Sequence, residues 1–237
     1  MIRKPGKDAK KPAPTRRPKP MPSARRPARE RAPEIFKRLA AAYPDARCAL
    51  DFQTPFQLLV ATILSAQCTD KRVNMVTPKL FATYPSPAAL AAARQEHVEE
   101  LVKPTGFFRN KTKSLLGVSA AIDARHGGDV PSTMDALVQL PGVGRKTANV
   151  VLGNAFNVNE GIVVDTHVTR VTRRLGLTKH EDAVKIEQDL VKLFPRDQWT
   201  LLAHLLIEHG RETCEARLPK CSRCPVAELC PSFGIGV

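Results

Sequence analysis

Hydrophobic side chains recur along this chain mainly with the period of an α-helix. Within residues 54–66 and again within 109–125, the apolar positions fall at spacings of three and four. Segments of the same kind, separated by Gly, Pro and polar clusters, predict helices over 33–43, 70–84, 87–94, 96–103, 133–140, 148–155, 166–175, 181–195 and 197–212. Asp70 and Ser132 are expected to cap two of these helices. Because strands do not alternate with helices and no long stretch has period two, the predicted fold class is all-α.

The segment 140–148 reads Leu-Pro-Gly-Val-Gly-Arg-Lys-Thr-Ala and lies between two predicted helices. Gly142 and Gly144 permit a tight turn and a close approach to another surface. The turn opens directly into a helix, whose first amides lack intrahelical partners and, with the helix macrodipole, favour an anion such as phosphate. Lys146 falls opposite the apolar stripe of that helix, and this stretch alone favours a solvated surface lysine.

The composition indicates an aliphatic core in one or two domains. Of the 237 residues, 43% are hydrophobic, with nine Phe, two Tyr and one Trp, which suits helices better than a β-sandwich. No apolar run approaches the roughly 18 residues of a membrane span, so no membrane association is expected. The first residues, Met-Ile-Arg-Lys, are not followed by an apolar segment, which argues against a secretory signal and favours a reducing, intracellular compartment.

The net charge of +14 is concentrated at the N-terminus, because residues 1–32 carry +10 and residues 33–237 carry +4. Residues 1–32 also hold seven prolines and few apolar side chains, and are predicted to form a disordered basic arm. A basic arm on a mildly basic body points to a polyanionic partner, most simply nucleic acid. A solubilising tail is one alternative, and a mitochondrial presequence is another, which the prolines disfavour because they break an amphipathic helix.

Four cysteines crowd near the C-terminus in the spacing C-x6-C-x2-C-x5-C, namely Cys214, Cys221, Cys224 and Cys230. In a reducing compartment four thiols at such spacing indicate metal ligands rather than disulfides. Zinc sites usually have two close cysteine pairs, whereas a cubane iron–sulfur cluster takes four thiolates from a short loop. The spacing, with one close pair, favours a 4Fe-4S cluster over zinc. Basic residues stand between the ligands, so the loop is expected to face DNA.

These features occur together with further motifs, namely LSAQCTD at 64–70, VDTHV at 164–168 and HGRETC at 209–214. In this combination, from about residue 33 to 232, the chain resembles endonuclease III, the bifunctional DNA glycosylase and AP lyase of the helix-hairpin-helix superfamily. The resemblance implies two helical lobes with the substrate between them. A six-helix barrel with the hairpin would occupy residues 54–160, and a lobe with the [4Fe-4S] cluster would combine 33–53 with 161–237.

The resemblance implies that Lys146 is the nucleophile and that Asp165 is its catalytic carboxylate partner. An amine that attacks the sugar C1′ displaces the base and leaves a Schiff base, which makes the neighbouring proton acidic enough for β-elimination. A free lysine has a pKa of about 10.4 and must lose its proton first. The helix N-terminus and burial against DNA favour that loss, whereas a nearby carboxylate opposes it.

A base inside a duplex must be extruded before an enzyme can act on it. The resemblance assigns Gln67 to the gap that the base leaves, and the loop at Phe107 to a second wedge, although the familiar pattern has leucine there. The alternatives are a polar helix end for Gln67 and local core packing for Phe107. Ser65, Asp70 and His167 are pocket candidates, and for His167 a packed or supporting role is the alternative. Contacts to DNA are expected from the hairpin, at Leu140, Gly142, Val143, Gly144, Arg145 and Thr147.

The sequence therefore predicts a monomeric base-excision-repair enzyme that removes oxidised pyrimidines from double-stranded DNA and nicks the abasic site. Its expected location is the bacterial cytoplasm, at the nucleoid, or else the nucleus or mitochondrion. One alternative is a monofunctional mispair glycosylase of the same superfamily, whose members lack the lysine at this position. Another is a non-catalytic helix-hairpin-helix module that only binds phosphate. The pairing of Lys146 with Asp165 argues against this alternative.

Overall fold

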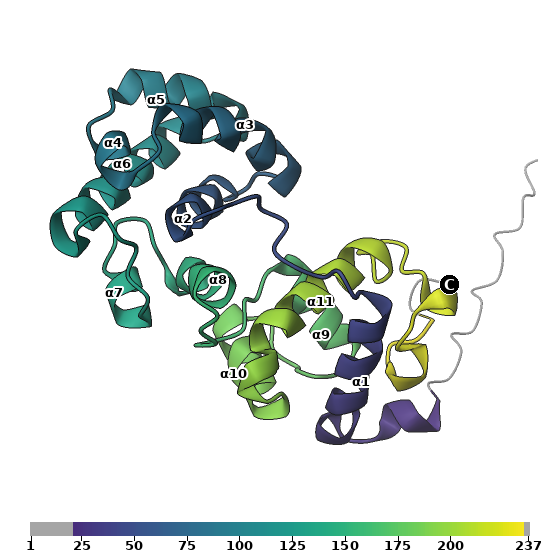
Figure 1. Ribbon diagram of the computed structural model, residues 1–237. Coiled ribbons are helices and arrows are strands. Elements are labelled where there is room, and N and C mark those ends of the chain that lie inside the picture. The colour runs from purple at the N-terminus through teal and green to yellow at the C-terminus, as the bar shows by residue number, and fades with distance from the viewer. Residues whose placement is uncertain (1–20, 235–237) are drawn as a thin grey trace, which may run out of the picture.

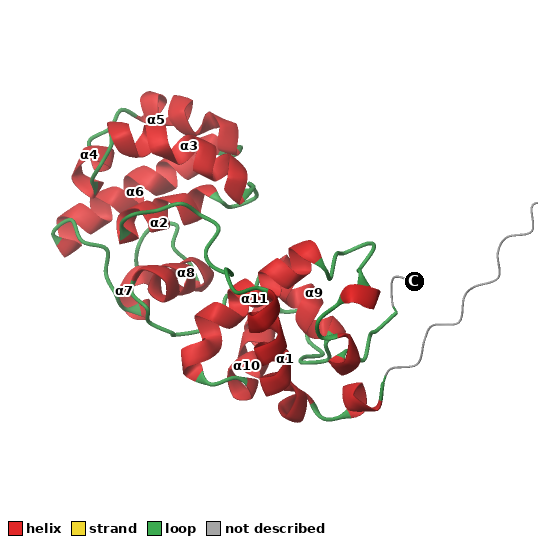
Figure 2. Cartoon of the chain, turned by 45° about the vertical axis from the view of Figure 1, so that its right-hand side comes forward, coloured by secondary structure: helices red, strands yellow, loops and turns green. Residues whose placement is uncertain are grey.

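The computed structural model describes residues 21–234, and every regular element in that range is a helix (Figures 1 and 2), which confirms the all-α expectation. None of these helices is long and apolar enough to cross a membrane. The α-helices are α1 (Ala28–Ala42), α2 (Pro55–Leu64), α3 (Asp70–Thr83), α4 (Pro87–Ala91), α5 (Gln95–Val102), α6 (Phe108–His126), α7 (Met134–Val138), α8 (Arg145–Ala155), α9 (Thr166–Arg174), α10 (Ala183–Leu193) and α11 (Trp199–Glu212). Short 3-10 helices occur at η1 (Pro22–Arg25), η2 (Lys103–Thr105), η3 (Arg196–Gln198), η4 (Cys221–Arg223) and η5 (Ala227–Leu229).

The first lobe is built around α2, whose side chains are apolar almost all round. Leu58, Leu59 and Leu64 are completely buried, because α2 packs on α3 and α6 at one side and on α8 at the other. The core of this lobe extends from Leu50 to Leu152. Pro55 occupies the first turn and Thr54 accepts a hydrogen bond from the backbone N–H of Gln57, which fixes where this central helix begins.

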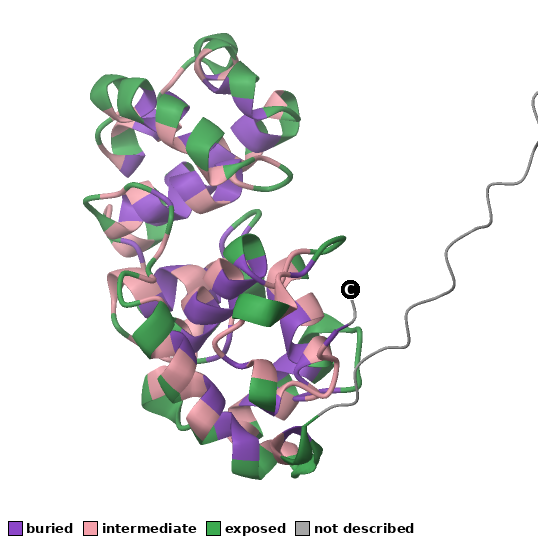
Figure 3. Cartoon of the chain, turned by 90° about the vertical axis from the view of Figure 1, so that its right-hand side faces the viewer, coloured by how far each residue is buried: buried purple, intermediate pink, exposed green. Residues whose placement is uncertain are grey.

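The second lobe has a separate core formed by the chain before α2 and the chain after α8. Its buried residues run from Ala32 to Leu39 and from Ile162 to Leu229. Helix α11 packs against α9 and α1, and the segment that carries the four cysteines closes over one end of the lobe. Figure 3 shows buried residues, in purple, along the helices of both lobes.

The two lobes meet where α8 crosses α11, and Gly153 makes that crossing close. A Cβ at Gly153 would collide with the side chain of Thr200 on α11, so any larger residue would push the helices apart. The chain passes between the lobes twice, once between α1 and α2 and once between α8 and α9. Residues that line the space between the lobes therefore come from distant parts of the sequence.

The N-terminal expectation was wrong for residues 21–32, while residues 1–20 of the expected arm lie outside the described part of the chain. The structure has η1 at Pro22–Arg25, and α1 begins at Ala28. Arg31 is only 3% exposed, and its guanidinium donates hydrogen bonds to the carbonyls of Leu175 (2.6 Å), Leu229 (2.8 Å) and Gly176 (3.2 Å). The backbone carbonyls at the end of α9 and near the cysteines need hydrogen-bond donors, and the Arg31 guanidinium supplies them. Arg31 therefore has a structural role.

Helix starts differ from the expected caps by one residue in two places. Thr69, not Asp70, accepts from the backbone N–H of Arg72 at the start of α3. Thr133, not Ser132, accepts from Ala136 at the start of α7. Each pair offers two capping residues in a row, and the cap is the residue whose extended backbone lets its side chain reach back to the third helical amide.

Candidate active site and cysteine cavity

The hairpin turn between α7 and α8 presents backbone rather than side chains. Gly142 has a φ of +75°, a conformation that favours glycine, and a Cβ there would lie 3.0 Å from the Ser114 side chain. The first backbone hydrogen bond of α8 runs from Ala148 N to Gly144 O (2.9 Å). The amides of residues 145–147 therefore remain available to an outside acceptor, as the sequence predicted.

The side chains expected to contact DNA from this turn lie in different surroundings. Leu140 and Val143 are buried in the core of the first lobe, so only their backbone faces outward. Arg145 is engaged by the second lobe, because its Nε and one terminal nitrogen lie 3.2 and 3.1 Å from the Glu187 carboxylate on α10. Asn149, one turn along α8, donates to the same carboxylate at 3.2 Å. The guanidinium of Arg145 is thus an interlobe contact rather than a free phosphate ligand.

A cleft of about 300 Å³ lies between the lobes beside this turn. Lys146 and Thr147 line it from the first turn of α8, and Asp165 lines it from the start of α9. Asp165 is the N-cap of α9, and its Oδ1 accepts from the backbone N–H of Val168 at 2.8 Å. Lys146 is exposed on the side of α8 away from the buried Ala148 and Val151, as its position in the sequence predicted.

Two ion pairs join the lobes near this cleft, and neither involves Lys146 or Asp165. One is Arg145 with Glu187, and the other is Arg211 on α11 with Asp70 on α3, at 2.6 Å. Asp70 lines the cleft, and its carboxylate accepts a hydrogen bond from Arg211. The Arg211–Asp70 pair joins two walls of the cleft, and the Arg145–Glu187 pair joins the lobes beside it.

Gln67 and Ser65 also line the cleft, from the loop between α2 and α3. The Ser65 hydroxyl donates to the carbonyl of Thr62 at 2.8 Å, and Ser65 is the C-cap of α2. Gln67 is exposed and has a φ of +53°, so it lies in a tight loop beyond the helix and not at a helix end. The loop therefore presents its amide side chain at the mouth of the cleft.

Phe107 does not belong to the core, so local core packing was the wrong alternative. Its side chain is 64% exposed and its φ is +48°, immediately before α6. The loop beneath it is held by Lys111, which is 5% exposed and whose Nζ donates to the carbonyl of Thr105 at 2.7 Å. Burial lowers the pKa of Lys111. The sequence did not single out this lysine, because a single lysine in a helix gives no sign of burial.

His167 lies outside the cleft that contains Lys146. It lines a neighbouring cavity with Asp70 and Arg211, and its Nδ1 lies 3.1 Å from a guanidinium nitrogen of Arg170. This position fits the supporting role better than direct contact with a base, because the ring belongs to a network that holds α9 against α11.

A polar face of α11, which the motifs did not single out, forms the opposite wall of the cleft. His204, Glu208 and Arg211 line the cleft at i, i+4 and i+7, a helical spacing that was readable in the sequence. His204 Nε2 lies 2.7 Å from Asn154 Oδ1 on α8. Burial lowers the pKa of His204 to about 4, with a smaller contribution from Arg211, so the imidazole is neutral at physiological pH.

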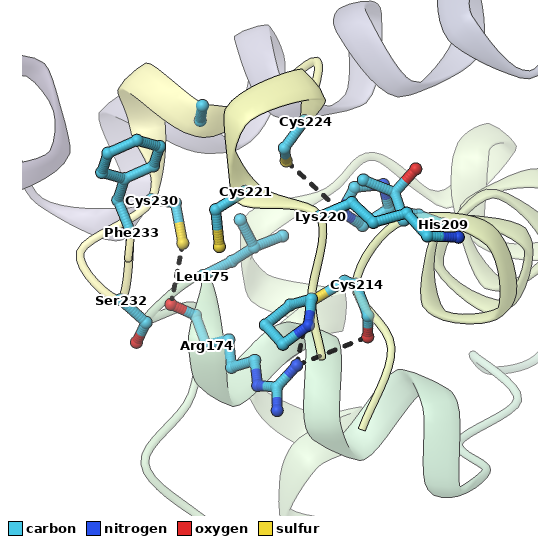
Figure 4. Close-up of a pocket in the computed structure, with 13 residues that line it drawn as sticks. Arg174, Leu175, His209, Cys214, Lys220, Cys221, Cys224, Cys230, Ser232 and Phe233 are labelled. Carbon is cyan, nitrogen blue, oxygen red and sulfur yellow. Dashed lines mark hydrogen bonds between the residues drawn. The ribbon is translucent and has the colours of Figure 1, made fainter. Parts of the chain in front are cut away.

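The four predicted cysteine ligands line one cavity in the second lobe, around Leu175 (Figure 4). All four are free thiols. Burial raises the pKa of Cys224 to about 12 and that of Cys230 to about 11, so these thiols ionise at neutral pH only when a positively charged group binds them. Among residues 21–234, no group of three or more His, Cys, Asp or Glu side chains is arranged to hold a single metal ion. The four thiols instead line the wall of the cavity.

Cationic and hydrogen-bonding groups accompany these thiols. Arg174 approaches Cys214 Sγ at 3.4 Å, and Lys220 lines the same cavity. His209 Nε2 lies 3.7 Å from Cys224 Sγ, and its Nδ1 lies 3.0 Å from the Tyr43 hydroxyl of α1. Four thiols with cationic neighbours and an apolar wall form a donor set that fits an iron–sulfur cluster.

A two-lobed helical protein with a glycine hairpin at the interlobe cleft has the architecture of a DNA repair glycosylase. Residues 60–196 match the HhH-GPD superfamily of base excision DNA repair proteins. Endonuclease III of Synechocystis sp. is 54% identical over 204 residues, which cover 86% of this chain and 93% of the relative. The chain therefore belongs to the endonuclease III family and is a base-excision DNA glycosylase.

Solved structures agree with this assignment. A non-covalent endonuclease III–DNA complex and a trapped endonuclease III–DNA covalent intermediate each superpose with a TM-score of 0.82 at 40% identity. Each covers 86% of this chain and 96% of the solved chain. A thymine-DNA glycosylase at 21% identity and a TM-score of 0.78 shares the fold.

Proposed function

We propose that the protein removes oxidised pyrimidines from duplex DNA and then cleaves the abasic site through a Schiff base at Lys146. The observation that carries this proposal is the cleft itself, where Lys146 from one lobe and Asp165 from the other line the same space beside the open amides of α8. The solved relatives include a trapped covalent endonuclease III–DNA intermediate, which supports a nucleophile of this kind. All these groups come from one chain, so we propose that it acts as a monomer.

The proposed chemistry begins when the Lys146 amine attacks C1′ of the damaged nucleotide. The new bond from nitrogen to C1′ forms as the glycosidic bond breaks, and the base leaves with the electron pair and takes up a proton. The sugar ring opens to a Schiff base, a proton leaves C2′, and the 3′ phosphate departs in β-elimination. Water then hydrolyses the Schiff base and frees the lysine.

Asp165 is proposed to stabilise positive charge at the sugar and to move protons. Its Oδ1 is bound to the amide of Val168, which fixes the carboxylate and leaves Oδ2 directed away from that bond. No ion pair among residues 21–234 includes Lys146, so within this part of the chain the amine is not held by a carboxylate before the substrate binds. This arrangement supports Asp165 as a partner in the reaction rather than as a permanent counter-ion.

Extrusion of the base requires groups that fill the vacated space, and we propose Gln67 and Phe107 for this role. Gln67 stands at the cleft and carries both a donor and an acceptor for the base left unpaired. Phe107 is an exposed aromatic ring on a loop fixed by the buried Lys111, which suits a side chain that stacks on an unpaired base.

We further propose that Cys214, Cys221, Cys224 and Cys230 hold a [4Fe-4S] cluster. A cluster held by these four thiols would tie the C-terminal loop to the second lobe and would fix the basic side chains around it for contact with DNA. The supporting observation is that all four thiols line one cavity with Arg174 beside them. Purified protein should be yellow-brown with about four irons per chain, and colourless protein with stoichiometric zinc would overturn this assignment.

The experiment that tests the function compares two aspartates with the same structural role. Asp182 caps α10 through its contact with the Lys185 amide (3.0 Å), as Asp165 caps α9, but Asp182 is not among the residues that line the cleft. Since asparagine also caps helices well, both Asp→Asn variants should fold. Base release and strand nicking are measured on a thymine glycol duplex. Asp165→Asn should be slower by about 100-fold or more, whereas Asp182→Asn should match the wild type. Equal rates for the two variants would remove the catalytic role of Asp165.

A further inference from the structure

The end of the cleft away from Lys146 is formed by Asn154 and His204. Lys146, Val150 and Asn154 follow one another at intervals of four on the same face of α8, and all three line the cleft. At 1.5 Å per residue, Asn154 lies about 12 Å along the axis from Lys146. Gly153 permits the close crossing of α8 and α11 and thereby brings Asn154 against His204.

A chain of hydrogen bonds determines which nitrogen of His204 carries the proton. Asn154 Nδ2 donates to the carbonyl of Val150 at 2.8 Å, and a carbonyl can only accept, so the amide orientation is fixed. Asn154 Oδ1 therefore faces His204 Nε2 at 2.7 Å, and this nitrogen must be the donor. Because the imidazole is neutral, Nδ1 has no proton and offers a lone pair.

His204 Nδ1 has no hydrogen-bond donor among the residues that the structure describes, since the ring's contact is the one from Nε2 to Asn154. His204 is part of the cleft lining, so a base bound in the cleft can supply this donor. A half-buried acceptor of this kind strongly favours a ligand with an N–H group and disfavours one with a lone pair in the same place.

We infer that His204 is a specificity-determining residue, whose Nδ1 accepts a hydrogen bond from the ring N3–H of an extruded pyrimidine. This inference rests on the proposed function, because it concerns the base that the enzyme removes. Bases derived from uracil and thymine carry a hydrogen on N3. Bases derived from cytosine have a lone pair on N3, which would face the lone pair of His204. The protein therefore prefers oxidised uracil-type and thymine-type bases over oxidised cytosine-type bases.

Two substrates separate this effect from the rest of the lesion. 5-Hydroxyuracil and 5-hydroxycytosine, each placed opposite guanine in the same duplex, share the oxidised position and differ at N3 and C4. Wild-type protein should release 5-hydroxyuracil with a kcat/KM roughly tenfold higher or more. Equal values, or a preference for 5-hydroxycytosine, would overturn the inference without any variant.

Variants then identify the residue responsible. His204→Leu removes the acceptor and should reduce the preference to less than about threefold, while His204→Gln supplies an amide oxygen and should restore it. His97→Leu is the matched control, because His97 contacts Tyr84 in the first lobe and is not part of the cleft lining. A His204→Leu protein that folds and retains the full preference would overturn the role of His204.

A separate experiment distinguishes a failure of this inference from a failure of the proposed function. Wild-type protein is incubated with a duplex that carries a preformed abasic site, and borohydride is added to trap any Schiff base. Failure to trap would contradict the Lys146 mechanism. Successful trapping together with no preference between the two bases would contradict only the role of His204.

Discussion

Glu187 provides a quantitative test of how the hairpin is attached to the second lobe. Its side chain is 11% exposed and receives two hydrogen bonds from Arg145, at 3.1 and 3.2 Å, and one from Asn149 at 3.2 Å. The proximity of Glu187 raises the pKa of Arg145. Glu187→Gln keeps the shape of the side chain but removes its negative charge. It also places an amide NH2 group, which is a hydrogen-bond donor, next to the Arg145 guanidinium.

The expected cost follows from the exposure of the two partners. A hydrogen bond to a charged group contributes about 1.5–3 kcal/mol to stability when it is buried. The Arg145 side chain is 51% exposed, so solvent screening reduces the contribution of its hydrogen bonds to Glu187. The loss should therefore be about 2 kcal/mol in the free energy of unfolding. In a chain of this size that corresponds to a decrease in Tm of roughly 4–8 °C.

Thermal unfolding followed by circular dichroism measures this effect. The matched control is Glu96→Gln, since Glu96 is 75% exposed and lies 3.9 Å from Arg94, so its loss should change stability by less than about 0.5 kcal/mol. Because Lys146 follows Arg145 directly, Glu187→Gln should also slow the trapping reaction. A Glu187→Gln protein as stable as the Glu96→Gln protein would refute the view that this carboxylate joins the lobes.

Three further predictions concern the turn, the wedge loop and the cleft. Gly142→Ala should destabilise the protein by about 1–2 kcal/mol, because φ is +75° and Ser114 is close, whereas Gly144→Ala, with φ of −92° and open space, should cost less than about 0.5 kcal/mol in urea unfolding. Lys111→Met should increase hydrogen exchange in residues 103–107, because Thr105 O loses its donor, and Lys113→Met, which changes an exposed lysine, should not. The pKa of His204 falls from 6.5 in the unfolded chain to about 4 in the folded one, so stability is complete above pH 6.5 and decreases as the pH falls toward 4. Wild type should lose up to roughly 1.4 kcal/mol more per pH unit in that window than His204→Gln, and parallel profiles would exclude this linkage.

Helical periodicity predicted the elements because the apolar stripes correspond to real buried faces. Leu115, Val118 and Ile122 are completely buried on α6, and the glycine turn between α7 and α8 has the geometry that its sequence requires. The four cysteines were found together because they are close in sequence, and the structure places them around one cavity. Local patterns of this kind can be read without knowing how helices pack.

The remaining features depend on contacts between distant segments. Arg31 was assigned to a disordered arm, because counting charges cannot show that its guanidinium binds the carbonyls of Leu175 and Leu229. Arg145 was predicted to contact DNA, and nothing in the sequence indicated its contact with Glu187, because that carboxylate lies on the other lobe. Asn154 and His204 went unnoticed because their pairing requires α8 and α11 to cross. Such contacts are set by tertiary packing, which the pattern of a single segment does not contain.

Borohydride trapping followed by peptide mapping tests most directly whether Lys146 is the nucleophile. Wild-type protein on a thymine glycol duplex should form one covalent adduct, and the attached peptide should contain Lys146. The Lys146→Ala variant should form none, whereas Lys185→Ala, which changes an exposed lysine on α10, should trap like the wild type. An adduct that persists in Lys146→Ala, or base release by the wild type without any trapped adduct, would contradict Lys146 as the nucleophile.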